Sequence, residues 1–350
     1  MLEDERYQAN LKGLLPFIYI IPSYIAHVVV IVAIFSKRYK EELGTNFFRL
    51  YAFSAVTAIL SSIFLFIYSR MRYIPCLLFF FHALPERSIF GTFLYIASYY
   101  FIYAELFVSL MLNINRATVV LLKTHYGRFW KKWLAISMIA LYLISVIFII
   151  HMCFTDVSLK LINPSDPDKG YDWSERQKLV WLKNSYIMLG IVAFVAIGSV
   201  AANLYVLIYL IMTSKNNSKT FDDTQKGNKD AQKRLFIFTG IMLINHLVFA
   251  AMQVMFLLIK DQPTIYLLIS AQSYVLDFIN LSPPWFLLFV SPQLRRCVLR
   301  MRLEFSHVVK ISAVSRVSQM PSIAPKQQTL FTTTHNKNNL GRSRSIMITA

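Results

Sequence analysis

Charged residues are scarce in this sequence. Asp, Glu, Lys and Arg together make up 15% of its 350 residues, while 56% of the residues are hydrophobic. Soluble globular domains carry about 25% charged residues. The mean hydropathy of +0.49 points the same way. This excess of apolar residues is typical of a chain that lies in a lipid bilayer, and it argues against an ordinary soluble domain.

Cysteine and histidine are also few. The three cysteines, Cys76, Cys153 and Cys297, show no C-x-x-C or other metal-ligand spacing, and the seven histidines form no close H-x-x-H or H-x-x-x-H pair. The sequence also lacks a nucleophile motif and a phosphate-binding loop. We therefore expect no metal, no cofactor and no enzymatic activity.

Acidic residues are outnumbered by basic ones, with 18 Asp and Glu against 36 Lys and Arg, for a formal net charge of +18. In a soluble protein this charge would suggest nucleic acid. Here the basic residues flank apolar runs, where they meet anionic lipid headgroups, so we expect membrane lipids and no nucleic acid as partners. The acidic N-terminus lacks the basic region of a signal peptide, so the first apolar run is predicted to remain as a membrane span.

Seven apolar segments are long enough to cross a bilayer. A hydrocarbon core about 30 Å thick needs a helix of about 20 apolar residues, with every backbone group bonded inside the helix. An eighth candidate, residues 74–84, is too short and is bounded by Pro75 and Pro85, so it is predicted to be an interfacial or re-entrant piece. The seven predicted spans are residues 14–35, 50–69, 90–112, 134–154, 186–212, 235–259 and 264–290.

Lys and Arg are unevenly distributed among the loops. The first, third and fifth loops and the segment after the last span carry most of them, and residues 116–132 alone hold five with no acid. Basic loops remain in the cytosol. The N-terminus is therefore predicted to lie outside. If residues 74–84 formed an eighth span, basic and less basic loops would be mixed on both sides of the membrane.

The predicted fold is thus an all-α bundle of seven transmembrane helices. It is divided into an extracellular N-terminus (residues 1–13), the helical domain (14–290), an amphipathic membrane-surface helix (291–305) and a disordered cytoplasmic tail rich in Ser and Thr (306–350). Ser291 is placed to cap the surface helix and Pro292 to begin it. Cys297, within this helix, is either palmitoylated or a plain reduced cysteine.

Acidic residues inside the spans are candidates for function. A charged side chain at the centre of a span costs about 2.5–3.5 kcal/mol on insertion scales, so it marks a functional or a paired structural site. Glu105 in the third span and Asp277 in the seventh are the two acids. Helical spacing places further polar groups on their faces and on one face of the sixth span. The predicted ligand-binding residues are Tyr95, Ser98, Glu105, Phe249, Gln253, Ser273 and Asp277. The alternative for Glu105 is a hydrogen bond that only holds helices together.

Two prolines break the last predicted span near its inner end. Pro283 and Pro284 remove two backbone donors, which predicts either a hinge or a static kink. On the predicted outer side, Cys76 precedes the third span and Cys153 ends the fourth. Both could face the oxidising compartment and form a disulfide, unless Cys153 is buried in lipid.

These features together resemble a G-protein-coupled receptor and, more narrowly, the nematode serpentine chemoreceptors of class gamma (Srg). The resemblance covers about residues 14–305. It is carried by SLMLNINR ending at Arg116, YGRFW beginning at Tyr126, SPPWF beginning at Ser282 and SPQLR beginning at Ser291. Asn115 and Arg116 stand where rhodopsin-like receptors carry an acid followed by Arg. The resemblance implies that these two residues meet a G protein, although Asn115 cannot form the neighbouring ion pair. The alternative for Arg116 is snorkelling to lipid phosphate.

The resemblance implies a chemosensory receptor of the plasma membrane, in sensory neurons or their cilia. Such a receptor would bind an odorant or pheromone-like small molecule in the outer half of the bundle and activate a heterotrimeric G protein through its cytosolic loops. A second hypothesis is an ion or proton transporter or channel that uses Glu105 and Asp277 as a relay. An inverted repeat would favour this second hypothesis, and the sequence shows none.

Overall fold

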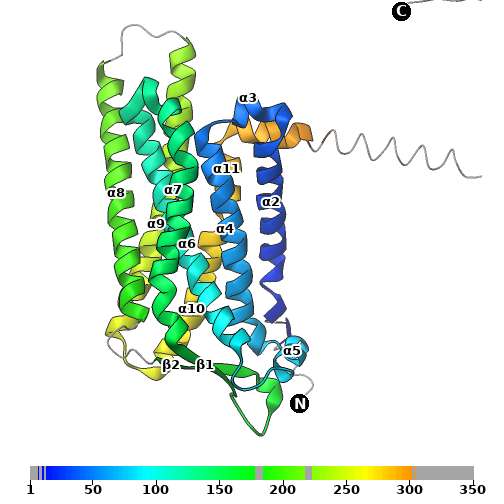
Figure 1. Cartoon of the computed structure of the whole chain (residues 1–350). Coiled ribbons are helices and arrows are strands. Elements are labelled where there is room, and N and C mark those ends of the chain that lie inside the picture. Colours follow the sequence, from blue (N-terminus) through cyan, green and yellow to red (C-terminus); the bar gives the residue numbers. More distant parts are fainter. Residues whose placement is uncertain are drawn as a thin grey trace, which may run out of the picture. The chain divides into compact units, whose positions relative to one another are not determined.

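The computed structural model describes residues 13–177, 184–216 and 223–301, together with Tyr7, Asn10, Leu11 and Leu303. The predicted tail from residue 306 onward, and Phe305 of the predicted surface helix, lie outside the described residues. Residues 1–302 form one compact unit, and its described part is a bundle of long helices (Figure 1).

The seven predicted spans are confirmed as helices, and the seventh is divided in two. By length and composition, the described residues contain six continuous apolar segments that can cross a membrane, one of which, Ile89–Phe154, includes both α6 and α7. The helices of the bundle are α2 (Phe17–Phe35), α4 (Asn46–Ser69), α6 (Ile89–Leu122), α7 (Tyr126–Ile149), α8 (Asn184–Asn216), α9 (Asp223–Leu258), α10 (Gln262–Leu281) and the short α11 (Pro283–Val290).

Helix α6 is longer than the bilayer requires. Its 34 residues give a length of about 51 Å, whereas the hydrocarbon core is about 30 Å thick. The prediction ended this span at residue 112, where the apolar run ends. The helix continues because its backbone hydrogen bonds do not depend on lipid. By contrast, residues 74–84 contain only a 3-10 turn, Pro75–Leu77, and the one-turn helix α5 (Phe79–His82), so they do not span.

Helix α6 occupies the centre of the bundle, in contact with α4, α7, α8 and α9. Helix α10 packs on α9, α4 and α2, and α11 packs on α9 and α2. The side chains between them form two large hydrophobic clusters, one toward each end of the bundle. The first includes Tyr95, Phe107, Phe249 and Leu276, and the second includes Phe47, Leu50, Phe238 and Leu287.

Among the described residues, a β-hairpin between α7 and α8 departs from the all-α prediction. Strands β1 (Thr155–Leu161) and β2 (Tyr171–Gln177) pair antiparallel, with Leu159 opposite Trp173. The turn before β2 needs a glycine, because Gly170 has φ +87° and a Cβ there would lie 2.3 Å from the carbonyl oxygen of Arg72. The hairpin lies at the end of the bundle where α6 begins and α4 ends (Figure 1); we call this the hairpin end.

Residues 292–301, at the opposite end, are helical. The predicted cap is confirmed, since the Ser291 hydroxyl accepts a hydrogen bond from the backbone N–H of Leu294 at 3.4 Å. Leu294 and Cys297 are fully buried in the hydrophobic cluster at this end, whereas Leu299 is half exposed. The buried face of this helix therefore packs on the bundle itself rather than on lipid alone.

Candidate functional site

A pocket of about 290 Å³ lies at the hairpin end, between α4, α6, α8, α10 and strand β2. Ligand pockets in proteins usually combine an apolar lining with a few polar groups that fix orientation. This pocket has that mixture. Its lining includes Tyr68, Ser98, Tyr99, Asp172, Trp173 and Ser273.

The β-hairpin is fixed over this pocket by strand β2. The Trp173 ring stacks on Tyr68 with centroids 5.6 Å apart, and its indole N–H donates a 2.8 Å hydrogen bond to the Tyr68 carbonyl. Beside it, Asp172 forms an ion pair of 2.7 Å with Arg72, whose side chain is 9% exposed. Because these two charges neutralise each other, the pocket offers polarity without a net charge.

The structure brings together only part of the predicted ligand site. Ser98 and Ser273 line the pocket. Tyr95 does not line the pocket, but its ring packs against the lining residues Tyr68 and Tyr99. Phe249 and Gln253 of α9 are buried but do not line the pocket. Helical spacing grouped these side chains correctly by helix face, but it could not give their depth in the bundle.

Asp277 links three helices instead of lining the pocket. Its carboxylate forms an ion pair with Arg70, at the end of α4, and accepts a 2.6 Å hydrogen bond from the Tyr19 hydroxyl of α2. The Arg70 guanidinium also lies over the Tyr274 ring, 4.6 Å from its centroid. The side chains of Arg70 and Asp277 are 13% and 5% exposed. The charge of Asp277 is thus compensated inside the bundle.

Glu105 lies deeper and is 2% exposed. Its Oε1 accepts a 3.1 Å hydrogen bond from Ser54 of α4, and its Oε2 is buried without a partner among the described residues. Farther along α4, Ser61 accepts a hydrogen bond from Asn280, and Asp277 is one turn beyond Asn280. The seven residues from Ser54 to Ser61 on α4 and the turn from Asn280 to Asp277 on α10 together correspond to about 15 Å along the bundle. Glu105 and Asp277 therefore do not form a pair.

Arg116 is buried toward the other end of α6, at 9% exposed. Its guanidinium lies over the ring of Phe47 in α4, with Cζ 3.5 Å from the centroid, and its Nε and Nη2 have no hydrogen-bond partner among the described residues. Phe47 in turn meets Phe238 of α9 edge-on at 6.2 Å. A cation–π contact thus holds Arg116, and the snorkelling geometry is absent from this structure.

The first turns of α7 are bonded back to α6 through the YGRFW motif. The Tyr126 hydroxyl donates a 3.2 Å hydrogen bond to Oδ1 of Asn115, which is fully buried. The Trp130 indole donates a 2.8 Å bond to the hydroxyl of Thr118. Asn115 therefore contacts the first residue of α7 where an acid would have faced Arg116.

A buried hydrogen-bond network that the sequence analysis did not identify connects α6, α8 and α9. The Asn113 amide donates to the Ser199 hydroxyl at 3.1 Å, and the Asn203 amide donates to Asn113 Oδ1 at 2.9 Å. The Thr239 hydroxyl completes the network by donating to Asn203 Oδ1 at 2.9 Å. Because Thr239 of α9 reaches Asn113 of α6 only through Asn203 of α8, movement of α9 away from α6 must break at least one of these bonds.

The break in the last span lies at Ser282. Helix α10 ends at Leu281, and Pro283 and Pro284 are the first two residues of α11. Next to the break, the imidazole Nε2 of His27 lies 2.9 Å from the carbonyl oxygen of Asn280. Helix α2 thus supplies a hydrogen-bond partner for a backbone carbonyl at the kink.

In a comparison with known proteins, residues 14–298 match the family model of the Srg chemoreceptors. The match runs from the first long helix into the helix after Ser291. The chain belongs to the Srg family. It is also similar to serpentine receptor class gamma-15 of Caenorhabditis elegans, at 23% identity over 329 residues that cover 89% of this chain and 94% of that protein. The predicted family is confirmed, and this Srg protein is a multi-pass membrane protein of a chemoreceptor family.

The three cysteines of this Srg protein are free, which is one of the alternatives that the sequence left open for each of them. Cys76 and Cys153 are free and exposed. Cys76 is in the turn next to α5, while Cys153 is in a turn that packs on α6 and α7, so the bridge is not formed. Cys297 is fully buried, and its thiol donates a 3.4 Å hydrogen bond to Glu42 of α3 (Lys40–Leu43). This burial opposes palmitoylation, because an acyl chain needs an accessible thiol.

Some of the missed elements had a signal in the sequence. Residues 155–161 alternate apolar and polar, as do Tyr171 and Trp173, and turn-forming Asn, Pro, Asp and Gly lie between them. That pattern predicts a hairpin. Arg70, the partner of Asp277, follows directly after a predicted span, where a basic residue indicates topology and gives no sign of a partner on another helix.

Proposed function

We propose that this Srg protein is a chemosensory G-protein-coupled receptor. It binds a small molecule at the hairpin end, which is extracellular, and activates a heterotrimeric G protein at the Arg116 end. One observation carries the proposal: helix α6 lines a pocket of mixed polarity near one end and holds the buried Arg116 near the other. Ser98 and Arg116 are 18 residues apart, or about 27 Å along the helix.

The pocket favours a small neutral ligand with an aromatic or aliphatic body. Its volume is about 290 Å³, near the lower end of ligand pockets. Tyr68, Tyr99 and Trp173 offer ring faces, and the hydroxyls of Ser98 and Ser273 offer hydrogen bonds. Since Arg72 and Asp172 already pair with each other, a charged ligand would find no free counter-charge there. An odorant or pheromone-like compound has this chemistry.

The opposite end supports a switch. Arg116 rests on Phe47, and Phe47 contacts Phe238 of α9. A ligand that binds the open state more tightly would shift the population toward a bundle in which α9 has moved outward. Arg116 would then leave Phe47 and present its unpartnered guanidinium nitrogens to the G protein. The basic loops on this side provide further contacts for that partner and for lipid headgroups.

The receptor would reside in the plasma membrane, in sensory neurons or their cilia, and would not be an enzyme. A relay through Glu105 and Asp277 fits less well. The two carboxyl groups are about 15 Å apart along the bundle, and Asp277 is paired with Arg70. A transporter would need further proton carriers between them.

The test is nucleotide exchange on a purified heterotrimeric G protein by the receptor in nanodiscs, against a panel of small neutral volatile and lipid-like compounds. Ser98→Ala should reduce the potency of an active compound about fivefold, because it removes about one net hydrogen bond. Ser145→Ala is the control, since Ser98 and Ser145 are both buried and both donate to a carbonyl of their own helix, but Ser98 lines the pocket and Ser145 does not.

Two outcomes would contradict the proposal. The first is equal potency in Ser98→Ala and wild type for every active compound together with unchanged potency in Trp173→Ala, which would place binding elsewhere. The second is ion flux through the protein in liposomes without nucleotide exchange, which would favour the transporter.

A further inference from the structure

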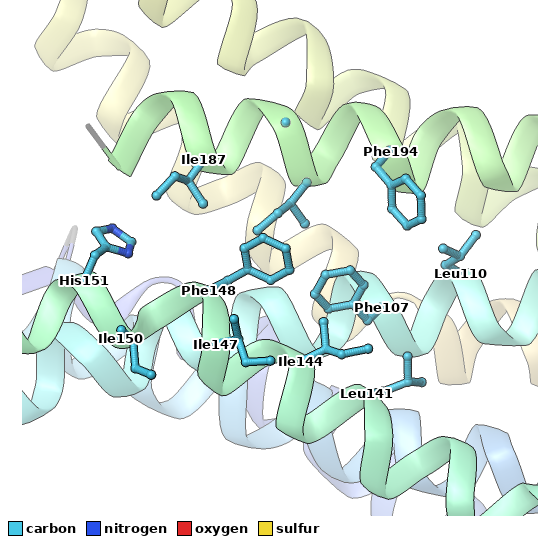
Figure 2. Close-up of a pocket in the computed structure, with 12 residues that line it drawn as sticks. Phe107, Leu110, Leu141, Ile144, Ile147, Phe148, Ile150, His151, Ile187 and Phe194 are labelled. Atoms are coloured by element: carbon cyan, nitrogen blue, oxygen red, sulfur yellow. The ribbon is translucent and has the colours of Figure 1, made fainter. Parts of the chain in front are cut away.

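A second and larger cavity opens on the side of the bundle. It has a volume of about 880 Å³ and lies between α6, α7 and α8. It shares no lining residue with the pocket at the hairpin end. Figure 2 shows His151 at one end of this cavity and Leu110 and Phe194 at the other, with side chains of α7 along its length.

The cavity opens toward lipid. Helices α7 and α8 each pack closely on α6. The side chains on the rim are large, apolar and exposed, with Ile147 at 65%, Ile150 at 55% and Phe194 at 62%. In a membrane-spanning bundle, exposed apolar side chains of this kind face the hydrocarbon. A molecule dissolved in the bilayer could therefore enter without passing through water.

A glycine keeps one wall of the cavity open. Gly190 of α8 lines the cavity, and a Cβ built on it would meet nothing within 4 Å. Glycine is unfavourable in the middle of a helix, and here no close backbone approach or positive φ requires it. Its effect is to leave space that any larger side chain would occupy.

Among the described residues that line the cavity, the one polar side chain is that of His151, which is buried and has a ring nitrogen without a partner. His151 is 8% exposed, and its Nε2 has no hydrogen-bond partner among the described residues. Of the two ring nitrogens, Nε2 is the one without a partner, and a neutral imidazole that carries its proton on Nδ1 leaves Nε2 as an acceptor. Buried acceptors of this kind are normally satisfied by a protein group, water or ligand.

We propose that this cavity binds a hydroxylated amphiphile from the bilayer, a long apolar molecule with one hydroxyl at its end. The apolar body fills the space along α7 and α8, and the hydroxyl donates to Nε2 of His151. Sterols and long-chain alcohols share this chemistry. The volume lies within the range of small-molecule sites, about 300–1,000 Å³. This site is independent of the proposed function, because it needs neither the pocket at the hairpin end nor a G protein.

The test is photolabelling of the purified full-length protein in nanodiscs. The probes are a diazirine-bearing sterol alcohol and a diazirine-bearing fatty alcohol, and the competitors are the same alcohols and their O-methyl ethers without the diazirine. At least one alcohol should label peptides of α7 and α8. Its unlabelled form should compete about fivefold better than the ether, which lacks the donor hydrogen.

Two variants and one control locate the site. His151→Phe should lower labelling about fivefold because it keeps the ring and removes the acceptor. Gly190→Leu should lower labelling strongly because its side chain projects into the cavity and obstructs the space along α8. Gly240→Leu is the matched control, since Gly240 also has nothing within 4 Å of its Cβ position but does not line this cavity. It should label as the wild type does.

Three results would overturn the proposal. Equal competition by alcohol and ether would indicate annular lipid only. Full labelling of a folded Gly190→Leu variant would place the probe elsewhere, and labelling by the matching fatty acid but not by the alcohol would mean that His151 acts as a cation. Should neither variant fold, the comparison of alcohol and ether on the wild-type protein still decides the question.

Discussion

The imidazole of His27 donates a hydrogen bond of 2.9 Å from Nε2 to the carbonyl oxygen of Asn280. In an unbroken helix this carbonyl would accept from the backbone N–H four residues later, at position 284. That residue is Pro284, which has no N–H. His27 of α2 therefore replaces the backbone donor that the proline removes, and it fixes α2 to the break between α10 and α11.

Replacing His27 should destabilise the receptor. His27→Phe leaves a buried carbonyl without a donor, which costs about 1–3 kcal/mol, whereas His27→Gln retains a donor and should lose less. The measurement is the thermal midpoint of the purified protein in detergent. A His27→Phe variant as stable as wild type would mean that water satisfies this carbonyl.

The Arg70–Asp277 pair gives a second stability prediction. Removing one partner of a buried ion pair costs about 3–5 kcal/mol because the other charge is left alone, while replacing both can be nearly neutral. Asp277→Asn should therefore lower the surface level and thermal midpoint strongly, and Arg70→Leu with Asp277→Leu should recover most of the loss. A double variant that is worse than either single variant would contradict this account of Asp277.

Cys297 should be far less reactive than the other two cysteines. Burial, and then the neighbouring Glu42 carboxylate, raise the pKa of its thiol to about 11. The thiolate is the reactive form, and its fraction falls as the pKa rises above the working pH. At pH 7.5, maleimide should modify the exposed Cys76 and Cys153 and should reach Cys297 only after unfolding. Equal rates at all three sites, or palmitate on Cys297, would show that this helix detaches from the bundle.

Phe47 should restrain basal signalling if Arg116 is the coupling residue. Phe47→Leu removes the ring below the guanidinium, a contact of about 1 kcal/mol, and should raise ligand-free nucleotide exchange up to about fivefold. Phe48→Leu is the matched control, because Phe48 is equally buried and does not lie under Arg116. Equal exchange in the two variants would remove Phe47 from the switch.

The long helices were predictable because lipid imposes a strict rule on them. Each span needs an apolar run of a fixed minimum length, so residues 50–69 and 186–212 lie inside the observed α4 and α8. The cap at Ser291 was predictable for a similar reason, since it depends on neighbouring residues only. The pairing of Arg70 with Asp277, and the depth of Glu105, depend on how the helices pack. Spacing along one helix gives the face of a side chain but not its partner on another helix.

The most direct measurement concerns Arg116, because the proposed function requires this residue to meet the G protein. Nucleotide exchange on a purified heterotrimer should be compared for wild type, Phe47→Leu, and Phe47→Leu combined with Arg116→Glu, at equal amounts of folded receptor and without ligand. The account predicts that exchange rises in the single variant and falls to background in the double variant. Exchange in the double variant equal to that of Phe47→Leu would contradict it.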